Sequence, residues 1–216
     1  MTLLAALVLF PTLKEGQFWD YTLTSRFTNT DTHLTNEESL RIRVDKVEPK
    51  AIQLTFVQKL SATIVDGQRI PTDLKAAPSE RKWTLLPTGS VAYSPAERGQ
   101  VEGVFQRVLR SIRDRDFDRG DWVSEYMDET ESMTSGAVAV VRGYQNRIRI
   151  DQISYRESGR QRVSGTAIWN SKLPFPELLK LRFPRTRMPG GTEDVACDLE
   201  LKFVPPPEKQ LQTAVH

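Results

Sequence analysis

The feature that most constrains this chain is an alternation of apolar and polar side chains over two neighbouring stretches. Apolar residues alternate with charged ones at 40–44, and one parity stays apolar from 52 to 64 except at Gln58. A period of two residues places the apolar side chains on one face of a β-strand. Turn sequences follow at 48–50 and 66–68. The sequence therefore predicts long antiparallel strands, connected as a meander, with one polar face.

Further strand signals fill the C-terminal part of the chain. GAVAVVRGY at 136–144 is apolar on both parities, which is typical of a central strand. Turn sequences at 159–160 and 189–191 are expected to connect hairpins, and three prolines at 205–207 end the last strand. The predicted strands span 121–132, 136–144, 146–157, 161–170, 179–187 and 194–204.

One segment has a helical period instead. Ser94 is a suitable N-cap, Pro95 suits the first helical position, and Glu97 completes a capping box. The apolar residues that follow at helical spacing are Val101, Val104, Phe105, Val108, Leu109 and Ile112. We expect an amphipathic helix at about 95–113 whose apolar stripe packs on the sheet.

Two similar stretches, EGQFWDYTLT and RGDWVSEYMDET, begin the strands on either side of this helix. In the first, Trp19 precedes Tyr21 by two residues, and in the second Trp122 precedes Tyr126 by four. Both spacings are even, so each pair is expected to face one side of its sheet. The preceding glycines are expected to make turns. We interpret the two stretches as equivalent entry strands of two related halves, which is consistent with duplication.

The predicted fold class is therefore mainly β. Long antiparallel meanders are expected to form a curved sheet or half-barrel in two similar halves, with the amphipathic helix packed on the sheet. The 216 residues, 38% of them hydrophobic, suffice for such a core. We expect a single domain at 13–205, built of halves at about 16–93 and 120–204 that the helix joins, and a loose tail at 206–216.

Composition excludes several classes of function. The 30 Lys and Arg against 28 Asp and Glu give a net charge of +2, and the basic segments are interrupted by acidic or apolar residues, so we expect no nucleic-acid partner. The one cysteine, Cys197, rules out an intrachain disulfide and a zinc site with several thiolates. Cys197 falls on the apolar parity of its strand, so we interpret it as a buried structural thiol.

The N-terminal residues 1–12 contain an apolar run, Leu3 to Phe10, of the length of a signal-peptide core. We interpret them as an export signal, truncated if Met1 is not the natural start; the alternative is a buried strand or helix that begins the fold. The expected location is therefore periplasmic or extracellular. No stretch is apolar enough for a transmembrane span.

Catalytic signatures are absent from the sequence. The two histidines are His33, in a polar turn, and His216, at the end of the chain, so a nucleophile has no evident base. The adjacent acids Glu37 and Glu38, and the acids at 128–131, are expected to point to opposite faces of strands. We therefore expect no enzymatic activity and no cofactor, with a carboxylate-dependent hydrolase as the remaining enzymatic alternative.

A weak calcium candidate follows the predicted helix. Asp114, Asp116, Asp118 and Glu125 stand at loop positions one, three, five and twelve of a calcium-binding loop. The turn glycine falls at the seventh position instead of the sixth, and interleaved arginines can neutralise the acids. A solvated helix exit with Arg and Asp pairs is the favoured interpretation.

Five aromatic residues are candidates for ligand binding. They line a cleft for an apolar or carbohydrate ligand, or they fill the core where sheet and helix meet; the core interpretation is favoured. The residues are Trp19, Tyr21, Trp122, Tyr126 and Trp169.

The chain resembles secreted bacterial β-rich proteins in four features. These are the apolar N-terminal segment, the G-x-x-W-x-Y opening, the second Gly and Trp at 120 and 122, and the turn-bounded strands ending in GTAIW at 165–169. More loosely, the chain looks like the LolA-like half-barrel superfamily of lipoprotein carriers. This resemblance implies an envelope or secreted location and an apolar cavity under the helix.

Our leading hypothesis is a non-enzymatic exported protein that binds an apolar small molecule or an envelope protein on the concave sheet face. The first alternative is a structural or interaction domain with a filled core.

Overall fold

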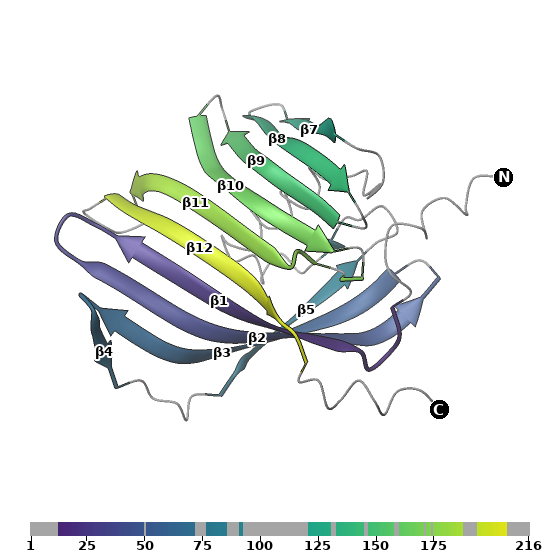
Figure 1. The fold of residues 1–216 in the computed structure, drawn as a ribbon, viewed down its shortest axis with the longest axis horizontal. Coiled ribbons are helices and arrows are strands. Elements are labelled where there is room, and N and C mark those ends of the chain that lie inside the picture. Colours follow the sequence, from purple (N-terminus) through teal and green to yellow (C-terminus); the bar gives the residue numbers. More distant parts are fainter. Residues whose placement is uncertain are drawn as a thin grey trace.

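The computed structural model describes residues 13–49, 51–71, 77–85, 91–92, 121–130, 133–144, 147–157, 160–170, 172–173, 175–187 and 194–206. These residues form strands and turns (Figure 1). The strands are β1 (Phe18–Thr28), β2 (His33–Glu48), β3 (Ala51–Val65), β4 (Gln68–Ile70), β5 (Ser79–Leu85), β6 (Val91–Ala92), β7 (Asp121–Thr130), β8 (Met133–Tyr144), β9 (Arg147–Glu157), β10 (Arg160–Asn170), β11 (Leu178–Arg187) and β12 (Asp194–Val204).

The observed strands confirm the alternation on which their prediction depends. In β2, Ile42 and Val44 are fully buried while Arg41 and Arg43 are exposed. The turn between β3 and β4 requires left-handed backbone, because Asp66 has φ 49° and Gly67 has φ 81°. Gly16 has φ 80° and lies in the turn before β1, as expected for a turn glycine. Short-range patterns therefore predicted where these elements begin and end.

All the described strands belong to one antiparallel sheet. Its order is β6-β5-β3-β2-β1-β12-β11-β10-β9-β8-β7, and β4 pairs with β3 beside this path. Two meanders, β1 to β6 and β7 to β12, are joined by the pairing of β1 with β12. The two Trp-containing entry strands consequently occupy different places: β1 lies inside the sheet, whereas β7 ends the path among the described strands. An origin by duplication stays a prediction.

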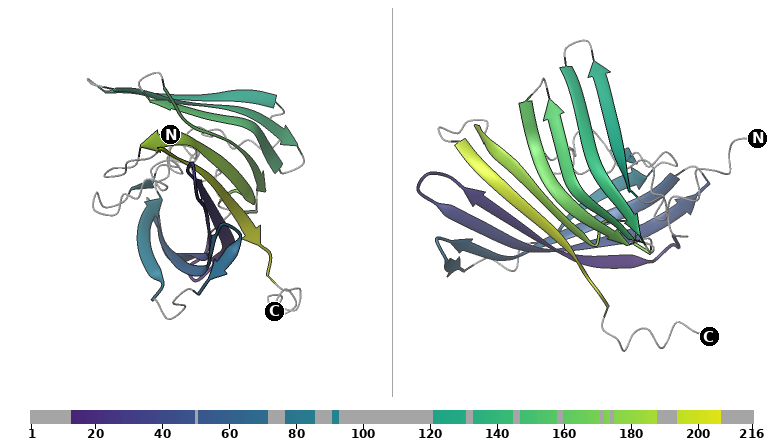
Figure 2. Two further views of the ribbon diagram at one scale, coloured as in Figure 1. Left: turned by 90° about the vertical axis from the view of Figure 1, so that its left-hand side faces the viewer. Right: turned by 45° about the horizontal axis from the view of Figure 1, so that its top comes forward.

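The sheet is strongly curved (Figure 2). In sheet order β3 and the connection between β10 and β11 are separated by β2, β1 and β12. The rings of Phe56 on β3 and Phe175 in that connection are nevertheless 5.7 Å apart between centroids. Side chains from parts of the sheet that are distant in strand order can meet in this way only on the concave side of the curved sheet. We call this concave side, which carries the buried core, the inner face, and the opposite side the outer face.

The predicted helix at about 95–113 is the part of the fold class that is wrong. Within the described ranges there is no helix, and hence none packed on the sheet; residues 95–113 themselves lie outside those ranges. A physical reason is visible at the core. Phe175 and Leu173 of the β10–β11 connection are buried against the inner face, so the curved sheet and its own loop supply packing there.

The outer face is polar, with charged pairs across and along the strands. Arg41 on β2 forms a two-point contact with Asp20 on β1, with N–O distances of 2.7 and 2.9 Å. Other pairs join neighbouring positions at distances from 2.6 to 3.7 Å: Arg43 with Asp45, Arg149 with Asp151, Arg142 with Asp151, Lys180 with Glu200, and Arg182 with Asp198. Exposed pairs of this kind contribute only about 0–1 kcal/mol each. The stability of the sheet therefore rests on its inner face.

The expected export signal at 1–12 and most of the expected tail, 207–216, lie outside the described ranges. Nowhere in the described part of the chain does a helix have the length and hydropathy needed to cross a membrane.

Candidate functional site

The inner face has a closed end, which we define by the β10–β11 connection and the start of β1. Here Tyr21, Trp169 and Phe175 are each about 1% exposed. Phe175 contacts Phe56, whose ring in turn lies 4.1 Å from the Trp83 ring between centroids. Aromatic side chains from opposite parts of the sheet thus meet without leaving solvent access to their rings. The closed end is filled core.

The β10–β11 connection is fixed at this end by specific hydrogen bonds. Trp169 Nε1 donates to the carbonyl oxygen of Leu173 at 2.9 Å, and Leu173 N–H donates to the carbonyl of Asn170 at 3.0 Å. The N–H of Phe203 on β12 donates to the carbonyl of Glu177 at 2.8 Å. The connection is therefore tied to both β10 and β12, which positions Phe175 over the core.

Tyr21 is an unusual member of this core. Its hydroxyl is buried without a hydrogen-bond partner, and so is Glu177 Oε2. Glu177 Oε2 does lie 3.4 Å from Arg147 Nη2, which is close enough for an ion pair but lacks hydrogen-bond geometry. Burial raises the pKa of Tyr21 well above its ordinary value, and the nearby Glu177 carboxylate raises it further. Tyr21 is thus held as a neutral phenol whose hydroxyl group adds no stabilising contact with protein atoms.

Removing the Tyr21 hydroxyl is expected to stabilise the fold. Tyr21→Phe keeps the ring and its edge-on contact with Phe203 while removing a buried donor without a partner, so the free energy of unfolding should rise by about 1 kcal/mol. Trp169→Phe is the contrasting variant, because it deletes the donor to Leu173; it should lower the free energy of unfolding by about 1–3 kcal/mol. Urea unfolding measures both. A clear loss of stability in Tyr21→Phe would contradict this account.

The opposite end of the inner face, near the β1–β2 turn and the start of β12, is only partly buried. We call it the open end. Along each of four adjacent strands, burial decreases from the buried middle of the strand toward this end. Trp19 on β1 and Phe203 on β12, beyond that middle at the closed end, are also only partly buried. On β1, Tyr21 is buried whereas Leu23 and Phe27 are partly exposed. The same change occurs from Ile42 to Leu40 and Leu34 on β2, from Leu181 to Phe183 on β11, and from Leu199 to Cys197 and Val195 on β12.

The open end has a polar flank on β2 and β3. Glu38 lies directly opposite Leu23 in the β1–β2 register, so its side chain shares the inner face. Gln58 Nε2 donates to Glu38 Oε2 at 2.7 Å, and Thr63 Oγ1 donates to Asn36 Oδ1 at 3.3 Å. All four of these residues are partly buried. The open end therefore combines a mainly apolar wall from β1, β11 and β12 with a flank on β2 and β3, where hydrogen-bonding groups stand among apolar side chains such as Leu34 and Leu40.

Cys197 lies in the apolar wall, opposite Phe27 on β1 and Phe183 on β11. Its placement on the inner face agrees with the predicted apolar parity, although it is partly rather than fully buried. Burial raises the pKa of the Cys197 thiol to about 11, with a further contribution from the Asp198 carboxylate. The thiol is therefore protonated and weakly nucleophilic at neutral pH.

Alkylation of Cys197 should show this raised pKa directly. Because the thiolate reacts and the pKa is about 11, the rate with iodoacetamide should rise about tenfold per pH unit from pH 8 to 10 and level off only near pH 11. The same protein unfolded in urea should level off about two units lower, near the ordinary thiol pKa of about 8.5. Mass spectrometry of quenched samples gives both profiles. A plateau by pH 9 in the folded protein would refute the buried thiol.

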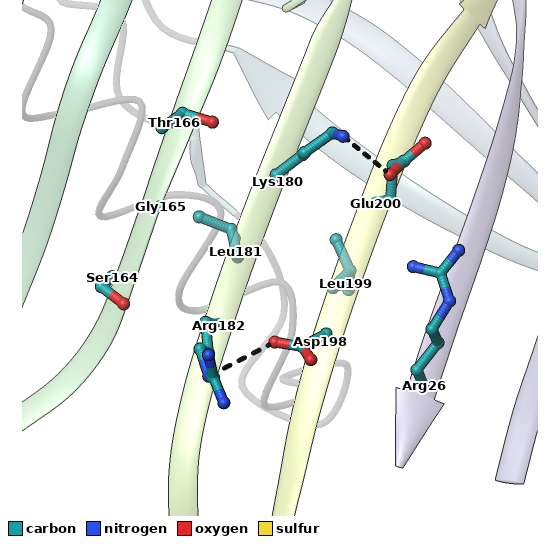
Figure 3. A pocket seen from close by; sticks show the side chains of 10 residues that line it. All are labelled: Arg26, Ser164, Gly165, Thr166, Lys180, Leu181, Arg182, Asp198, Leu199 and Glu200. Carbon is teal, nitrogen blue, oxygen red and sulfur yellow. Dashed lines mark ion pairs between the residues drawn. The ribbon is translucent and has the colours of Figure 1, made fainter. Parts of the chain in front are cut away.

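A groove of about 300 Å³ lies on the outer face across β1, β12, β11 and β10 (Figure 3). Lys180 pairs with Glu200 and Arg182 with Asp198, and Arg26 adds a positive charge from β1. The side chains of Arg182 and Asp198 are 72% and 51% exposed, so water screens their charges strongly. This groove is a solvated surface with two ion pairs and one further positive charge from Arg26.

The sequence-derived candidates are placed as follows. Tyr21 and Trp169 belong to the buried core and Trp19 packs against it, partly buried. Trp122 and Tyr126 belong to strand β7, whose side chains lie outside the described part of the structure. Asp114, Asp116 and Asp118 of the calcium candidate lie outside the described ranges altogether. Glu125 lies within β7. The described residues include no group of three or more His, Cys, Asp or Glu side chains that could hold a metal ion.

Sequence reasoning missed the open end itself. Leu23, Phe27 and Phe183 carry the same alternating signal as fully buried residues, and only the change in burial along each strand separates them. Glu38 offered one signal, since it occupies an apolar parity between Leu34 and Leu40, where an acid is unexpected.

The fold and site define a curved, open antiparallel sheet with an amphipathic end on its inner face. No family model and no curated protein matches the chain. Among solved structures, a DUF1329 family protein from Desulfovibrio piger aligns over 92% of this chain and 90% of its own, with 8% identity and a TM-score of 0.27. A hypothetical protein from Chlamydia trachomatis aligns over 96% and 95%, with 9% identity and a TM-score of 0.24. These TM-scores are too low for either protein to inform the fold or function of this chain.

Proposed function

We propose that this protein is a non-enzymatic binding protein that takes up an apolar molecule at the open end of its inner face. The observation that carries the proposal is the decrease of burial along β1, β2, β11 and β12, which leaves apolar side chains partly exposed on a concave surface. When a ligand covers partly exposed apolar surface, the free energy of binding becomes more favourable by about 25 cal/mol per Å² of area removed from water. Concave apolar surfaces with a few polar groups are typical of small-molecule sites.

The proposal includes export to the periplasm or the extracellular space. Its support is the apolar run from Leu3 to Phe10, which has the length of a signal-peptide core. An apolar ligand also suits such a location, because a molecule that is poorly soluble in water needs a carrier between membranes. Detection of the cleaved N-terminus in a periplasmic or culture fraction would test this part separately.

A structural or interaction domain is the second candidate, because the closed end is filled by Tyr21, Trp169 and Phe175. The two functions differ in one measurable property. A binding protein should increase the fluorescence of the neutral apolar probe N-phenyl-1-naphthylamine and release lipid in mass spectrometry after gentle purification. A structural domain should do neither, and this result would overturn the proposed binding function.

Two phenylalanines on β1 give a matched test of where the probe binds. Phe27 lies on the inner face at the open end, whereas Phe18 lies on the outer face, is 50% exposed, and has the Arg41 guanidinium 4.4 Å from its ring centroid. Phe27→Asn should weaken probe binding about tenfold, because about 1.4 kcal/mol of apolar contact is lost. Phe18→Asn should leave the affinity unchanged within about twofold. Equal effects of the two substitutions would place the probe elsewhere.

Cys197 offers an independent readout of the same site. A ligand that covers the apolar wall should slow alkylation of Cys197 at pH 9, because the thiol lies between Phe27 and Phe183 in the sheet register. Alkylation that stays equally fast at saturating probe concentration would show that the ligand does not occupy the open end.

A further inference from the structure

The polar flank of the open end indicates what kind of apolar molecule would bind there. The wall formed by β1, β11 and β12 is mainly apolar, whereas the neighbouring flank on β2 and β3 presents four polar side chains among apolar ones such as Leu40 and Leu60. The polar side chains are those of Asn36, Glu38, Gln58 and Thr63. Because these strands are adjacent in the sheet, the two parts are continuous. An amphipathic ligand fits this division: its hydrocarbon part would cover the wall, and its head group would face the flank.

Glu38 sets the chemistry of the flank. Its carboxylate accepts a hydrogen bond from Gln58 through Oε2, which fixes the side chain on the inner face and leaves further acceptor positions on the two oxygens. The residues opposite Glu38 in the strand register are Leu23 on β1 and Leu60 on β3, so no cation lies directly opposite its carboxylate. Among the described residues of β5, Arg81 is the cation on the inner face, and it lies opposite Phe56 of β3.

We propose, building on the proposed function, that the open end selects amphipathic molecules with a protonated amine as head group, and that Glu38 is the residue that determines this specificity. An ammonium group can donate to the free acceptor positions of the carboxylate, and such charge-assisted hydrogen bonds are about twice as strong as neutral ones. A carboxylate head group would be repelled by Glu38 instead. Binding involves no covalent step.

The test uses the full-length protein and competition with N-phenyl-1-naphthylamine by three ligands of equal chain length. These are dodecylamine, dodecanol and dodecanoate, each below its aggregation concentration at pH 7.5. Dodecylamine is expected to displace the probe at about tenfold lower concentration than dodecanol, because a charge-assisted hydrogen bond replaces a neutral one. Dodecanoate should be the weakest of the three.

Two adjacent acids provide the matched variants. Glu37 lies opposite Thr24 and is exposed on the outer face, whereas Glu38 lies on the inner face. Glu38→Gln should reduce the preference for dodecylamine over dodecanol to within about twofold, with dodecanol affinity unchanged, while Glu37→Gln should keep the full preference.

The outcomes separate this inference from the proposed function. If the probe and dodecanol bind but dodecylamine has no advantage over dodecanoate, the amine specificity is overturned and the binding function stands. The same holds if both glutamine variants lose the preference equally, since Glu38 would then have no special role. If neither the probe nor any of the three ligands binds, both proposals are overturned. The ligand comparison on the unchanged protein decides the specificity even if Glu38→Gln fails to fold.

Discussion

Phe175→Ala is expected to lower the free energy of unfolding by about 3–5 kcal/mol, the usual cost of truncating a fully buried phenylalanine. Phe175 is 1% exposed, and its ring contacts Phe56 edge-on at 5.7 Å between centroids. Phe56 in turn contacts Trp83. The substitution therefore removes a contact between two distant parts of the sheet in addition to apolar burial. Urea unfolding followed by tryptophan fluorescence and by circular dichroism measures the loss.

Phe18→Ala is the matched control for this experiment. Phe18 is 50% exposed on the outer face, so its truncation should change the free energy of unfolding by no more than about 0.5 kcal/mol. Similar effects of the two substitutions would contradict the role given to Phe175. If Phe175→Ala cannot be isolated as a folded protein, Phe175→Leu, which keeps most of the apolar volume, should fold with a smaller loss.

Gly165→Ala is expected to lower the free energy of unfolding by about 3 kcal/mol, at the upper end of the usual cost of overpacking. A Cβ at this position would lie 2.1 Å from the carbonyl oxygen of Lys180 and 2.9 Å from Leu181 Cδ2. The first contact is with backbone, which cannot move aside as a side chain can. A register shift in the β9–β10 pairing also occurs between Gly165 and Ala167. The backbones of β10 and β11 would have to separate to admit the methyl group.

Thr166→Ala is the neighbouring control, since Thr166 is exposed on the outer face and its truncation should be nearly neutral. Urea unfolding compares the two variants under the same conditions. A stable Gly165→Ala protein would show that β10 and β11 are not packed as closely as described.

The sequence predicted the strands well because their signal is local. Alternation at Ile42 and Val44 reports directly which side of the strand is apolar, and Gly16 and Gly67 mark turns that need positive φ. The helix predicted at about 95–113 depends on the same kind of local periodicity, but a period does not show what packs on the sheet. The observed packing partner is Phe175, in a connection that has no periodic signal at all.

The candidate site was less accessible to sequence reasoning. Tyr21 and Trp169 were candidates for ligand binding, with core as the favoured alternative, and both are core residues. Phe27 and Leu40 share the apolar parity of their buried neighbours, so no pattern within one strand separates an open end from a closed one. That difference arises where four strands are placed side by side and the β10–β11 connection covers one end of them.

By itself, the sequence determined the turn glycines Gly16 and Gly67 and the apolar face of strands such as β2, because these follow from the conformations open to a few consecutive residues. Tertiary structure alone decided the pairing of β1 with β12, the curvature that brings Phe56 to Phe175, and the exposure of Phe27 and Glu38 at the open end. These features depend on contacts between residues distant in sequence. Their free energies come from packing and hydrogen bonding that no local pattern encodes.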